Sequence, residues 1–468
     1  MKRYEQLVEL ISGRIRAGVL RAGDKVPSVR MLSTSNEMGP ATVLRALHML
    51  EDRGEIHARP RSGYYVCPRR GAAEPQTSRP PLASTRVNVS DLVFQILGTV
   101  GRPDVVPLGS AFIDPAVFPL KKLARSAAVA VRTLDPALLV ASLPTGHAEL
   151  RRAISRRYLD AGMAVPVEDI VITNGCMEAL NLCLQAVTRP GDVVAIESPA
   201  FYVALQAIER LGLKAVELPT HPREGVDLAA LDAAITRHGV KACWFMTSFQ
   251  NPLGALMPPE KKHDLVKLLS RHGVPLIEDD VYEELYFGAH KPRPARAWDR
   301  DGLVMHCSSF SKCLAPGFRV GWAAPGRWAR QVERLKLMTT LATGFHAQAA
   351  LADYLRHGGY DHHLRGLRAK LEGQQRAILT AIARDFPAGT RITQPQGGYF
   401  VWVELPGNAD ALEVHRLAMR VGISIAPGPV FSPQRKFGNC IRINTGQPWT
   451  PRIGKAVATL GQIVASLA

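Results

Sequence analysis

The stretch that organises this chain is Ser308-Ser309-Phe310-Ser311-Lys312-Cys313-Leu314-Ala315-Pro316-Gly317-Phe318-Arg319-Val320-Gly321-Trp322, in which an amine, several hydroxyls and a guanidinium share one short loop. A lysine amine forms an imine with an aldehyde, and Ser309, Ser311 and Arg319 can hold a phosphate dianion. The stretch therefore favours a site for a phosphorylated aldehyde anchored on Lys312. Taken alone, it also fits a solvated loop, so the rest of the chain decides.

The composition predicts more than one folded unit. The chain has 468 residues, of which 46% are hydrophobic and 21% are charged, so it is too long for one simple core and apolar enough to bury several. Its formal net charge of +17 favours an anionic partner, although arginine-rich composition also arises from genome bias.

The cysteines and histidines show no pattern for a disulfide framework or a metal centre. The cysteine count is seven, and the sequence contains no Cys-x-x-Cys and no His-Glu-x-x-His. We therefore expect a reducing compartment and no metal site. The N-terminus has no apolar signal core, and no apolar run is long enough to span a bilayer. These features predict a soluble cytoplasmic protein without a membrane partner.

Residues 1–67 have the pattern of a winged helix-turn-helix. Apolar positions from Leu7 to Ile15 recur at helical spacing, Ser28 suits the N-cap of a second helix, and Pro40 suits the first position of a third. Two short strand-like runs, 55–59 and 64–66, follow as a wing.

This arrangement predicts contact with double-stranded DNA, because one helix can enter a major groove while the wing contacts phosphates. Residues 1–70 hold thirteen lysines and arginines against seven acids, so the unit is itself basic. The alternative is a helical docking module without a DNA role. The candidate DNA contacts are Ser28, Arg30, Ala41, Thr42, Arg45, Arg59 and Arg61.

Residues 68–88 carry prolines, serines and arginines without hydrophobic periodicity, which predicts a flexible linker. From residue 89 to 468, strand-like runs such as 169–173, 192–196 and 242–246 alternate with helical stretches. This alternation predicts an α/β fold with a mostly parallel sheet.

Polar motifs follow the predicted strands, where ligands bind in sheets of this kind. The run Asn174-Gly175-Cys176-Met177 opens a helix whose first amides can face a phosphate. Arg442 lies inside an apolar strand pattern, where a guanidinium is costly without an anionic partner. Arg442 therefore implies an anionic partner.

The lysine loop, the turn Ser248-Phe249-Gln250-Asn251-Pro252-Leu253-Gly254 and the run Glu278-Asp279-Asp280-Val281-Tyr282 resemble fold-type I aminotransferases, which use pyridoxal 5'-phosphate. The resemblance implies a smaller α+β subdomain, a covalent bond from Lys312 to the cofactor, and an Asp279 carboxylate on the pyridinium nitrogen. Asn251 and Tyr282 would approach the phenolic oxygen. Asp280 is the competing choice for the ring nitrogen.

The same resemblance implies roles for the remaining candidates. Phe201, or second Tyr202, would stack on the pyridine ring, and Arg442 would bind the substrate carboxylate. The phosphate would be held by Gly175, Cys176, Met177, Ser309, Ser311 and Arg319.

The chain departs from the aminotransferase pattern at two places. Cys176 and Met177 replace hydrogen-bonding side chains near the phosphate, so only backbone contacts remain there. Ala141 stands where the family often has a tyrosine that reaches the neighbouring subunit's phosphate, which predicts a weaker grip across a dimer interface.

The runs Gly-Asp-Lys-Val-Pro-Ser-Val-Arg (23–30) and Arg-Ser-Gly-Tyr-Tyr-Val (61–66) resemble GntR-type bacterial regulators. A GntR-like winged helix joined to an aminotransferase-like unit is the arrangement of the MocR group of regulators, which the chain resembles over its whole length. The resemblance implies a homodimer that senses an amine, an amino acid or the cofactor through an aldimine on Lys312.

Two alternatives stay open. The first is a working aminotransferase in which Lys312, Asp279 and Tyr282 are catalytic. The second is a DNA-binding protein whose cofactor unit serves only for dimerisation, against which the retained Lys312 and Asp279 argue.

Overall fold

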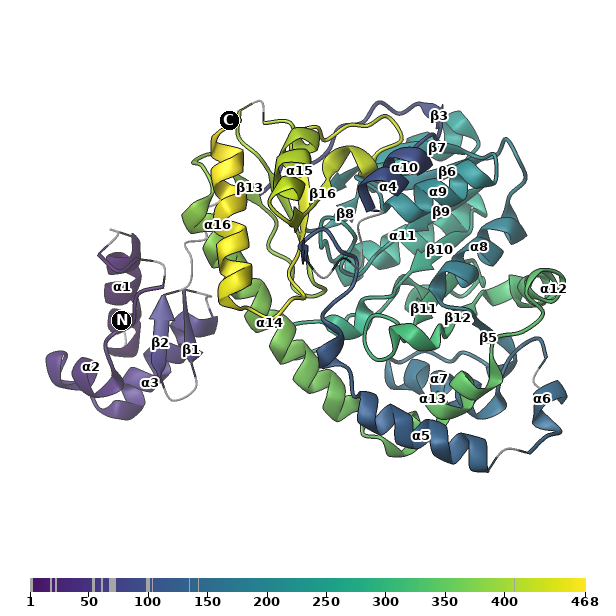
Figure 1. The fold of residues 1–468 in the computed structure, drawn as a ribbon, viewed down its shortest axis with the longest axis horizontal. Coiled ribbons are helices and arrows are strands. Elements are labelled where there is room, and N and C mark those ends of the chain that lie inside the picture. Colours follow the sequence, from purple (N-terminus) through teal and green to yellow (C-terminus); the bar gives the residue numbers. More distant parts are fainter. Residues whose placement is uncertain are drawn as a thin grey trace.

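The computed structural model describes residues 3–16, 19–21, 23–52, 55–59, 62–66, 73–97, 102, 104–133, 135–141, 143–407 and 409–468. The N-terminal unit lies at one end of the molecule (Figure 1). Its helices and its antiparallel wing are α1 (Arg3–Arg16), α2 (Val29–Ser35), α3 (Pro40–Asp52), β1 (Ile56–Arg59) and β2 (Gly63–Val66).

One apolar cluster holds this small unit together. Leu7 and Ile11 of α1 pack with Leu47 and Leu50 of α3, and all four are fully or almost fully buried. The Oγ of Ser28 accepts a hydrogen bond from the Met31 amide at 3.2 Å and caps α2, as the sequence predicted. The order of helices and wing is therefore the predicted one.

Residues 73–86, in the expected linker, are attached to the large unit. The Ala73 carbonyl accepts from the Ile392 amide at 3.1 Å, and Ser78 Oγ accepts from the Thr220 amide at 2.9 Å. Strand β3 (Ser84–Arg86) pairs antiparallel with β7 (Lys214–His221). Residues 73–86 are therefore not the free tether that their composition predicted. Several of their polar and backbone groups form hydrogen bonds with the large unit instead of with solvent.

The large unit is built around a sheet that, in the described residues, has nine strands in the order β3-β7-β6-β9-β10-β11-β12-β5, with β8 paired to β7. The pairs β7-β6, β6-β9, β9-β10 and β10-β11 are parallel. The strands not yet given bounds are β5 (Val171–Thr173), β6 (Val193–Ser198), β8 (Gly225–Val226), β9 (Ala242–Phe245), β10 (Leu276–Asp279), β11 (Val304–Ser309) and β12 (Gly321–Ala324).

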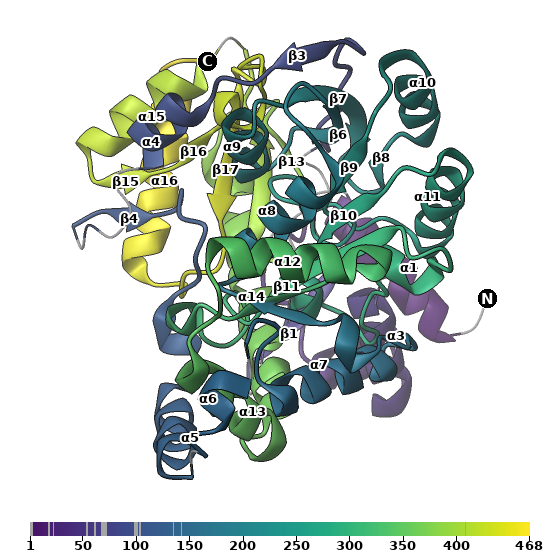
Figure 2. The ribbon, with the colours of Figure 1, turned by 90° about the vertical axis from the view of Figure 1, so that its right-hand side faces the viewer.

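Both faces of this sheet are buried, because successive residues of a strand point to opposite faces. In β9, Cys243 and Phe245 pack with α10 and α11, whereas Trp244 belongs to the core cluster of the opposite face, with α8. Figure 2 shows α10 and α11 on one side of the sheet and α8 and α12 on the other. The helices of this unit are α4 (Ser90–Leu97), α5 (Leu120–Arg132), α6 (Leu138–Ala141), α7 (Ala148–Asp160), α8 (Cys176–Val187), α9 (Tyr202–Arg210), α10 (Leu228–His238), α11 (Pro259–His272), α12 (Ala329–Thr339) and α13 (Phe345–His357).

A smaller α+β subdomain completes the chain. Its antiparallel sheet has the order β13-β14-β17-β16, and a short parallel pair joins β15 to β4. The long helix α14 runs from the large sheet to this subdomain (Figure 1). The elements are β4 (Val106–Pro107), β13 (Arg391–Ile392), β14 (Phe400–Glu404), β15 (Ile423–Ser424), β16 (Ala426–Pro427), β17 (Cys440–Asn444), α14 (Tyr360–Asp385), α15 (Ala411–Arg420) and α16 (Pro451–Ala465).

The predicted fold class is confirmed: a mostly parallel α/β sheet follows a winged helix-turn-helix and is joined to a smaller α+β subdomain. Within the parts of the chain that the structure describes, no helix combines the length and the apolar character needed to cross a bilayer.

Candidate functional site

The predicted site residues gather at one edge of the large sheet. Strands β6, β9, β10 and β11 are parallel, and β5 runs parallel to β11 because both pair antiparallel with β12. Their carboxyl ends therefore share one edge. At or just beyond these ends lie Gly175, Phe201, Asn251, Asp279 and Lys312.

Lys312 lies in the loop between β11 and β12. Its Nζ donates to the Ala111 carbonyl at 3.0 Å and lies 4.1 Å from the centre of the Phe112 ring. Loss of hydration, together with the Arg442 charge, lowers the pKa of Lys312 from 10.5 to about 8. A substantial fraction of the amine is therefore neutral near physiological pH, and only a neutral amine is nucleophilic.

Asp279 ends β10 and is almost fully buried. Burial, and then the neighbouring Asp280 charge, raise its pKa to about 7, while the Lys312 charge acts in the opposite direction. The Cys176 thiol lies 3.9 Å from Asp279 Oδ1. A cationic group beside Asp279 would favour the carboxylate form.

Arg442 ties the smaller subdomain to the site. From the centre of β17, its Nη1 donates to Asn251 Oδ1 at 3.0 Å and its Nη2 donates to the Gly109 carbonyl at 2.7 Å. Its guanidinium also stacks on the Phe400 ring, 4.2 Å from the centre. Within the part of the chain that the structure describes, the hydrogen bonds of this fully buried cation go to Asn251 and to backbone carbonyls, and none goes to a carboxylate.

Several buried polar atoms at this edge lack a hydrogen-bond partner within the described residues. They are Asn251 Nδ2, the Tyr282 hydroxyl and Arg442 Nε. Orphaned buried donors are rare in folded proteins, because each costs roughly 1–3 kcal/mol. Donors of this kind suit an oxygen-bearing ligand, so the residues present fit a group with a phenolic oxygen and a carboxylate nearby.

A second cluster forms a cradle for an anion at the start of α8. Gly175 precedes the helix with φ 79° and no side-chain cap, so the first amides of α8 stay free for a ligand. Arg319 Nη1 donates to Ser311 Oγ at 3.4 Å, and the Ser311 amide donates to Ser309 Oγ at 3.3 Å. A Cβ on Gly175 would lie 2.4 Å from Arg319 Nη2, so this cradle requires glycine.

The remaining site candidates lie nearby without such direct contacts. Met177 is partly buried and packs on the core, and Phe201 stands at the start of α9, with its ring 4.8 Å from that of Tyr202. Tyr202 is buried, with its ring 5.7 Å from that of Phe431. Ala141 ends α6, and its side chain lies outside the described residues.

The sequence analysis missed residues 109–112, which close the site. The Gly109 and Ser110 carbonyls accept from Arg442, and the Ala111 carbonyl accepts from both Lys312 and the Tyr399 hydroxyl. These contacts use backbone oxygens, which any residue supplies. The one side-chain contact that the segment adds, the Phe112 ring on Lys312, could come from any aromatic residue, so only the three-dimensional arrangement reveals this part of the site.

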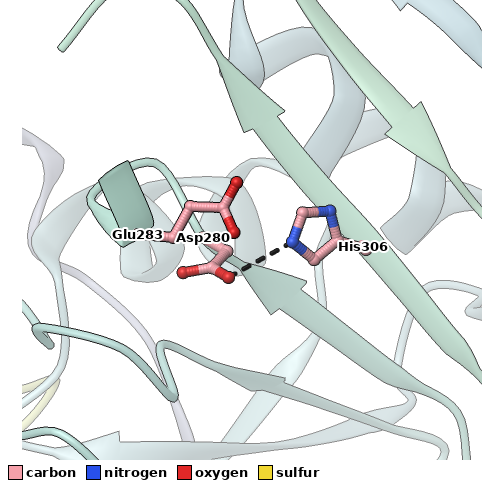
Figure 3. Close-up of side chains that lie close together, drawn as sticks. All are labelled: Asp280, Glu283 and His306. Atoms are coloured by element: carbon pink, nitrogen blue, oxygen red, sulfur yellow. Dashed lines mark hydrogen bonds and ion pairs between the residues drawn. The ribbon is translucent and has the colours of Figure 1, made fainter. Parts of the chain in front are cut away.

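Asp280, Glu283 and His306 form a buried cluster behind Asp279 (Figure 3), in which one possible ligand atom per residue lies within 4.8 Å of the others. Glu283 is paired with Lys291 at 3.2 Å, and His306 uses both ring nitrogens, one on Asp280 and one on Tyr158. These bonds favour a hydrogen-bonded network over a metal site. Asp280 thus faces His306, whereas Asp279 faces Lys312 and Cys176.

The DNA-contact candidates lie on the winged helix. Ser28, Arg30, Ala41 and Arg45 are exposed, and Thr42 is half-buried. The Arg45 guanidinium stacks on Tyr4, 4.5 Å from the ring centre, as Arg59 does on Tyr65 at 4.1 Å. Arg61 lies outside the described residues.

Two family models match the chain. One, described as aminotransferase class I and II, matches residues 120–452, and the other, described as bacterial regulatory proteins of the gntR family, matches residues 3–66. The chain is 48% identical over 467 residues to the HTH-type transcriptional regulator YdcR of Escherichia coli, covering 99% of each chain.

Solved aminotransferase structures resemble the large unit. The kynurenine aminotransferase of Pyrococcus horikoshii shares 27% identity with a TM-score of 0.75, covering 80% of this chain and 94% of that one. LysN, the alpha-aminoadipate aminotransferase of Thermus thermophilus, shares 28% identity with a TM-score of 0.73, covering 81% of this chain and 99% of that one.

Proposed function

Because the chain belongs to the aminotransferase class I and II family and carries a gntR-family unit at its N-terminus, we propose that it is a DNA-binding transcriptional regulator controlled by its pyridoxal 5'-phosphate site. The order of the two units confirms the resemblance to MocR-type fusions, and pyridoxal 5'-phosphate is the cofactor of this class of fold. We assign Lys312 as the residue that binds the cofactor covalently, through a Schiff base on its Nζ.

The observation that carries this proposal is the set of unsatisfied donors around Lys312. Within the described residues, Asn251 Nδ2 and the Tyr282 hydroxyl are buried and donate to no protein group, and they would donate to the phenolic oxygen of the ring. Asp279 would hold the protonated ring nitrogen, and Phe201 would stack on the ring. When bound, the cofactor supplies an aldehyde and an electron-withdrawing ring.

The phosphate would lie in the cradle described above. The first amides of α8, at Cys176 and Met177, point along the helix axis at its positive end. Ser309, Ser311 and Arg319 supply hydroxyls and a cation from the loop after β11. The cradle consists of two short segments, the start of α8 and the loop after β11. We propose that these segments hold this arrangement before the ligand binds.

The effector that fits Arg442 is an amino acid. A buried guanidinium is stabilised by a carboxylate, which accepts two parallel hydrogen bonds from it. The LysN structure is of a complex with N-(5'-phosphopyridoxyl)-L-leucine, a phosphopyridoxyl group joined to an amino acid. An amine without a carboxylate, or the cofactor alone, would leave Arg442 unpaired.

The attached segment 73–86 supports communication between the two units. It is bonded to Ile392 of the smaller subdomain and to Thr220 of the large sheet, and Glu74 pairs with Arg223. Seven residue steps separate Val66 from Ala73, a reach of at most about 25 Å. Ligand-induced movement of the smaller subdomain would therefore change where the winged helix can lie.

We propose a homodimer, with 1–67, 68–88 and 89–468 as the winged helix, linker and cofactor unit. Two winged helices at a fixed spacing would contact successive turns of double-stranded DNA. Ser28, Arg30, Ala41, Thr42, Arg45, Arg59 and Arg61 are the proposed contacts.

A second candidate function is amino-acid transamination. Such a half-reaction needs a neutral fraction of Lys312 and a carboxylate at Asp279, and a cationic ring nitrogen beside Asp279 would favour the carboxylate over the protonated form that burial favours. The 2-aminoadipate transaminase of Thermus thermophilus is 30% identical over 379 residues.

One experiment separates the two functions. Purified full-length protein is loaded with pyridoxal 5'-phosphate and titrated with a panel of amino acids and amines while its visible absorbance is recorded. We expect a stable spectral shift with one compound and no turnover. Keto acid formed over many cycles would favour the enzyme, and no Schiff-base band with the cofactor alone would contradict both.

A further inference from the structure

We propose that Asp280, His306 and Tyr158 form a positioning relay behind Asp279, which sets the charge beside the cofactor's ring nitrogen. This inference rests on the proposed cofactor function and concerns how the protein controls the charge at that site. No residue of the relay contacts the ligand site directly. Each acts through Asp279.

The relay is a continuous line of hydrogen bonds in the protein interior. His306 Nε2 lies 3.2 Å from Asp280 Oδ2, and His306 Nδ1 lies 2.7 Å from the Tyr158 hydroxyl, which accepts from Trp322 Nε1 at 2.8 Å. Figure 3 shows the His306 ring directed at the Asp280 carboxylate. Asp280 and His306 are fully buried, and Tyr158 is nearly so.

Backbone bonds hold Asp280 in this position. Its amide donates to the Cys307 carbonyl at 2.9 Å, and its carbonyl accepts from Ser308 Oγ at 2.9 Å. Asp280 follows directly on Asp279, so their side chains leave the end of β10 in different directions. These backbone bonds keep the Asp280 carboxylate on the His306 side of the strand end.

The donors along this line permit two protonation states without moving any heavy atom. Trp322 can only donate. In the neutral state, the Tyr158 hydroxyl donates to His306 Nδ1, and Nε2–H donates to Asp280. In the charged state, both ring nitrogens donate and the Tyr158 proton turns away. Although burial lowers the pKa of His306, its bond to Asp280 raises it above the ordinary value.

Other charged groups surround both ends of the relay. Glu278 and Glu283 act on His306, and Glu283 is itself paired with Lys291. On the other side, the Lys312 charge lowers the pKa of Asp279, while Glu197, whose pKa burial raises to about 8, stays neutral below that pH. Of the charges around Asp279, Asp280 raises its pKa most, and Asp280 itself faces two partners, the hydrogen-bonded His306 and the buried Lys262.

Asp280 and His306 are therefore expected to have opposite effects on the pH at which the Lys312 nitrogen loses its proton in the holoprotein. Removing the Asp280 charge takes a negative charge away from the neighbourhood of Asp279, so with the cofactor bound the Lys312 nitrogen would hold its proton less tightly. Replacing a charged His306 by a neutral side chain removes the positive charge hydrogen-bonded to Asp280 and leaves Lys262 as its cationic neighbour, so the proton would be held to higher pH. Because Asp280 is the main cause of the raised pKa of His306, a neutral residue at 280 also removes most of the charge of His306.

The test is a pH titration of the Schiff-base absorbance in the holoprotein. For Asp280→Asn we expect the midpoint to fall, and for His306→Gln to rise, each by about one pH unit. The double variant should match Asp280→Asn, because the effects are not additive. Glu197→Gln is the matched control and should leave a midpoint below about pH 8 unchanged.

Each result decides something. Shifts of the same sign in both single variants, additive shifts, or no shift would overturn the relay while the cofactor proposal stands. A wild-type protein without the band would overturn the cofactor proposal and the relay with it. Should His306→Gln fail to fold, Asp280→Asn must still lower the midpoint relative to Glu197→Gln.

Discussion

Arg442 donates from Nη1 to Asn251 Oδ1 at 3.0 Å, and Asn251 Nδ2 is left buried without a partner among the residues that the structure describes. The guanidinium thus turns the amide so that its donor end can face the proposed phenolic oxygen. Arg442 of the smaller subdomain thereby orients Asn251 of the large unit. Its positive charge is still available to bind a carboxylate.

We therefore expect Arg442→Gln to lose amino-acid binding selectively. Removing one partner of a buried charge pair costs about 2–5 kcal/mol, so affinity for an amino acid should fall by a factor of about 30 or more. The corresponding decarboxylated amine should bind about as before. Spectral titration of the holoprotein with both ligands measures the ratio, and an equal loss for both would contradict the assignment.

The lowered pKa of Lys312 predicts the pH dependence of cofactor attachment. Only the neutral amine attacks the aldehyde, and its fraction rises through about pH 8 rather than through the ordinary value of 10.5. The rate at which the Schiff-base band appears should rise with pH and level off above about 8. Lys312→Ala should show no band and gain no mass on borohydride reduction, and a band in that variant would place the anchor elsewhere.

A pair of glycine variants isolates the phosphate cradle. Gly175 (φ 79°) and Gly191 (φ 93°) both have left-handed backbones, but a Cβ would meet Arg319 at Gly175 and no atom within 4 Å at Gly191. Both alanine variants should lose about 1 kcal/mol or more of stability. Only Gly175→Ala should also weaken cofactor binding, by roughly tenfold or more. Equal affinities in a fluorescence titration would show that the cradle lies elsewhere.

The site residues that follow strands could be predicted from the sequence, because motifs such as Asn251-Pro252 and Asp279 come soon after apolar runs. Other parts of the site leave no pattern of side chains in the sequence, and only the structure shows them. Residues 109–112 act through backbone carbonyls, and His306 belongs to a strand that reads as plain core. The choice between Asp279 and Asp280 depends on which way each side chain points, which alternation alone does not tell.

The linker shows a different limit. Proline and serine content predicted a free tether over 68–88, yet Ser78 and Thr220 exchange hydrogen bonds and β3 joins the sheet edge. An edge strand offers unpaired backbone groups to any extended chain. The composition of a segment indicates how readily it is solvated. It gives no information about a nearby sheet edge with which the segment can pair.

The winged helix should bind DNA through Arg45 in a salt-dependent way. Arg45 is exposed in the middle of α3, and the guanidinium at the end of its aliphatic stem stacks on the Tyr4 ring. Arg45→Gln keeps most of that stem and removes one positive charge. On a random-sequence duplex we expect weaker binding and a fall of about 1 in the slope of log affinity against log salt concentration.

The matched control is Arg237→Gln, which changes an exposed arginine of α10 and should leave the slope unchanged. Cofactor loading should be the same in both variants, because neither residue is near the site. A slope that stays constant in Arg45→Gln would remove α3 from the DNA interface.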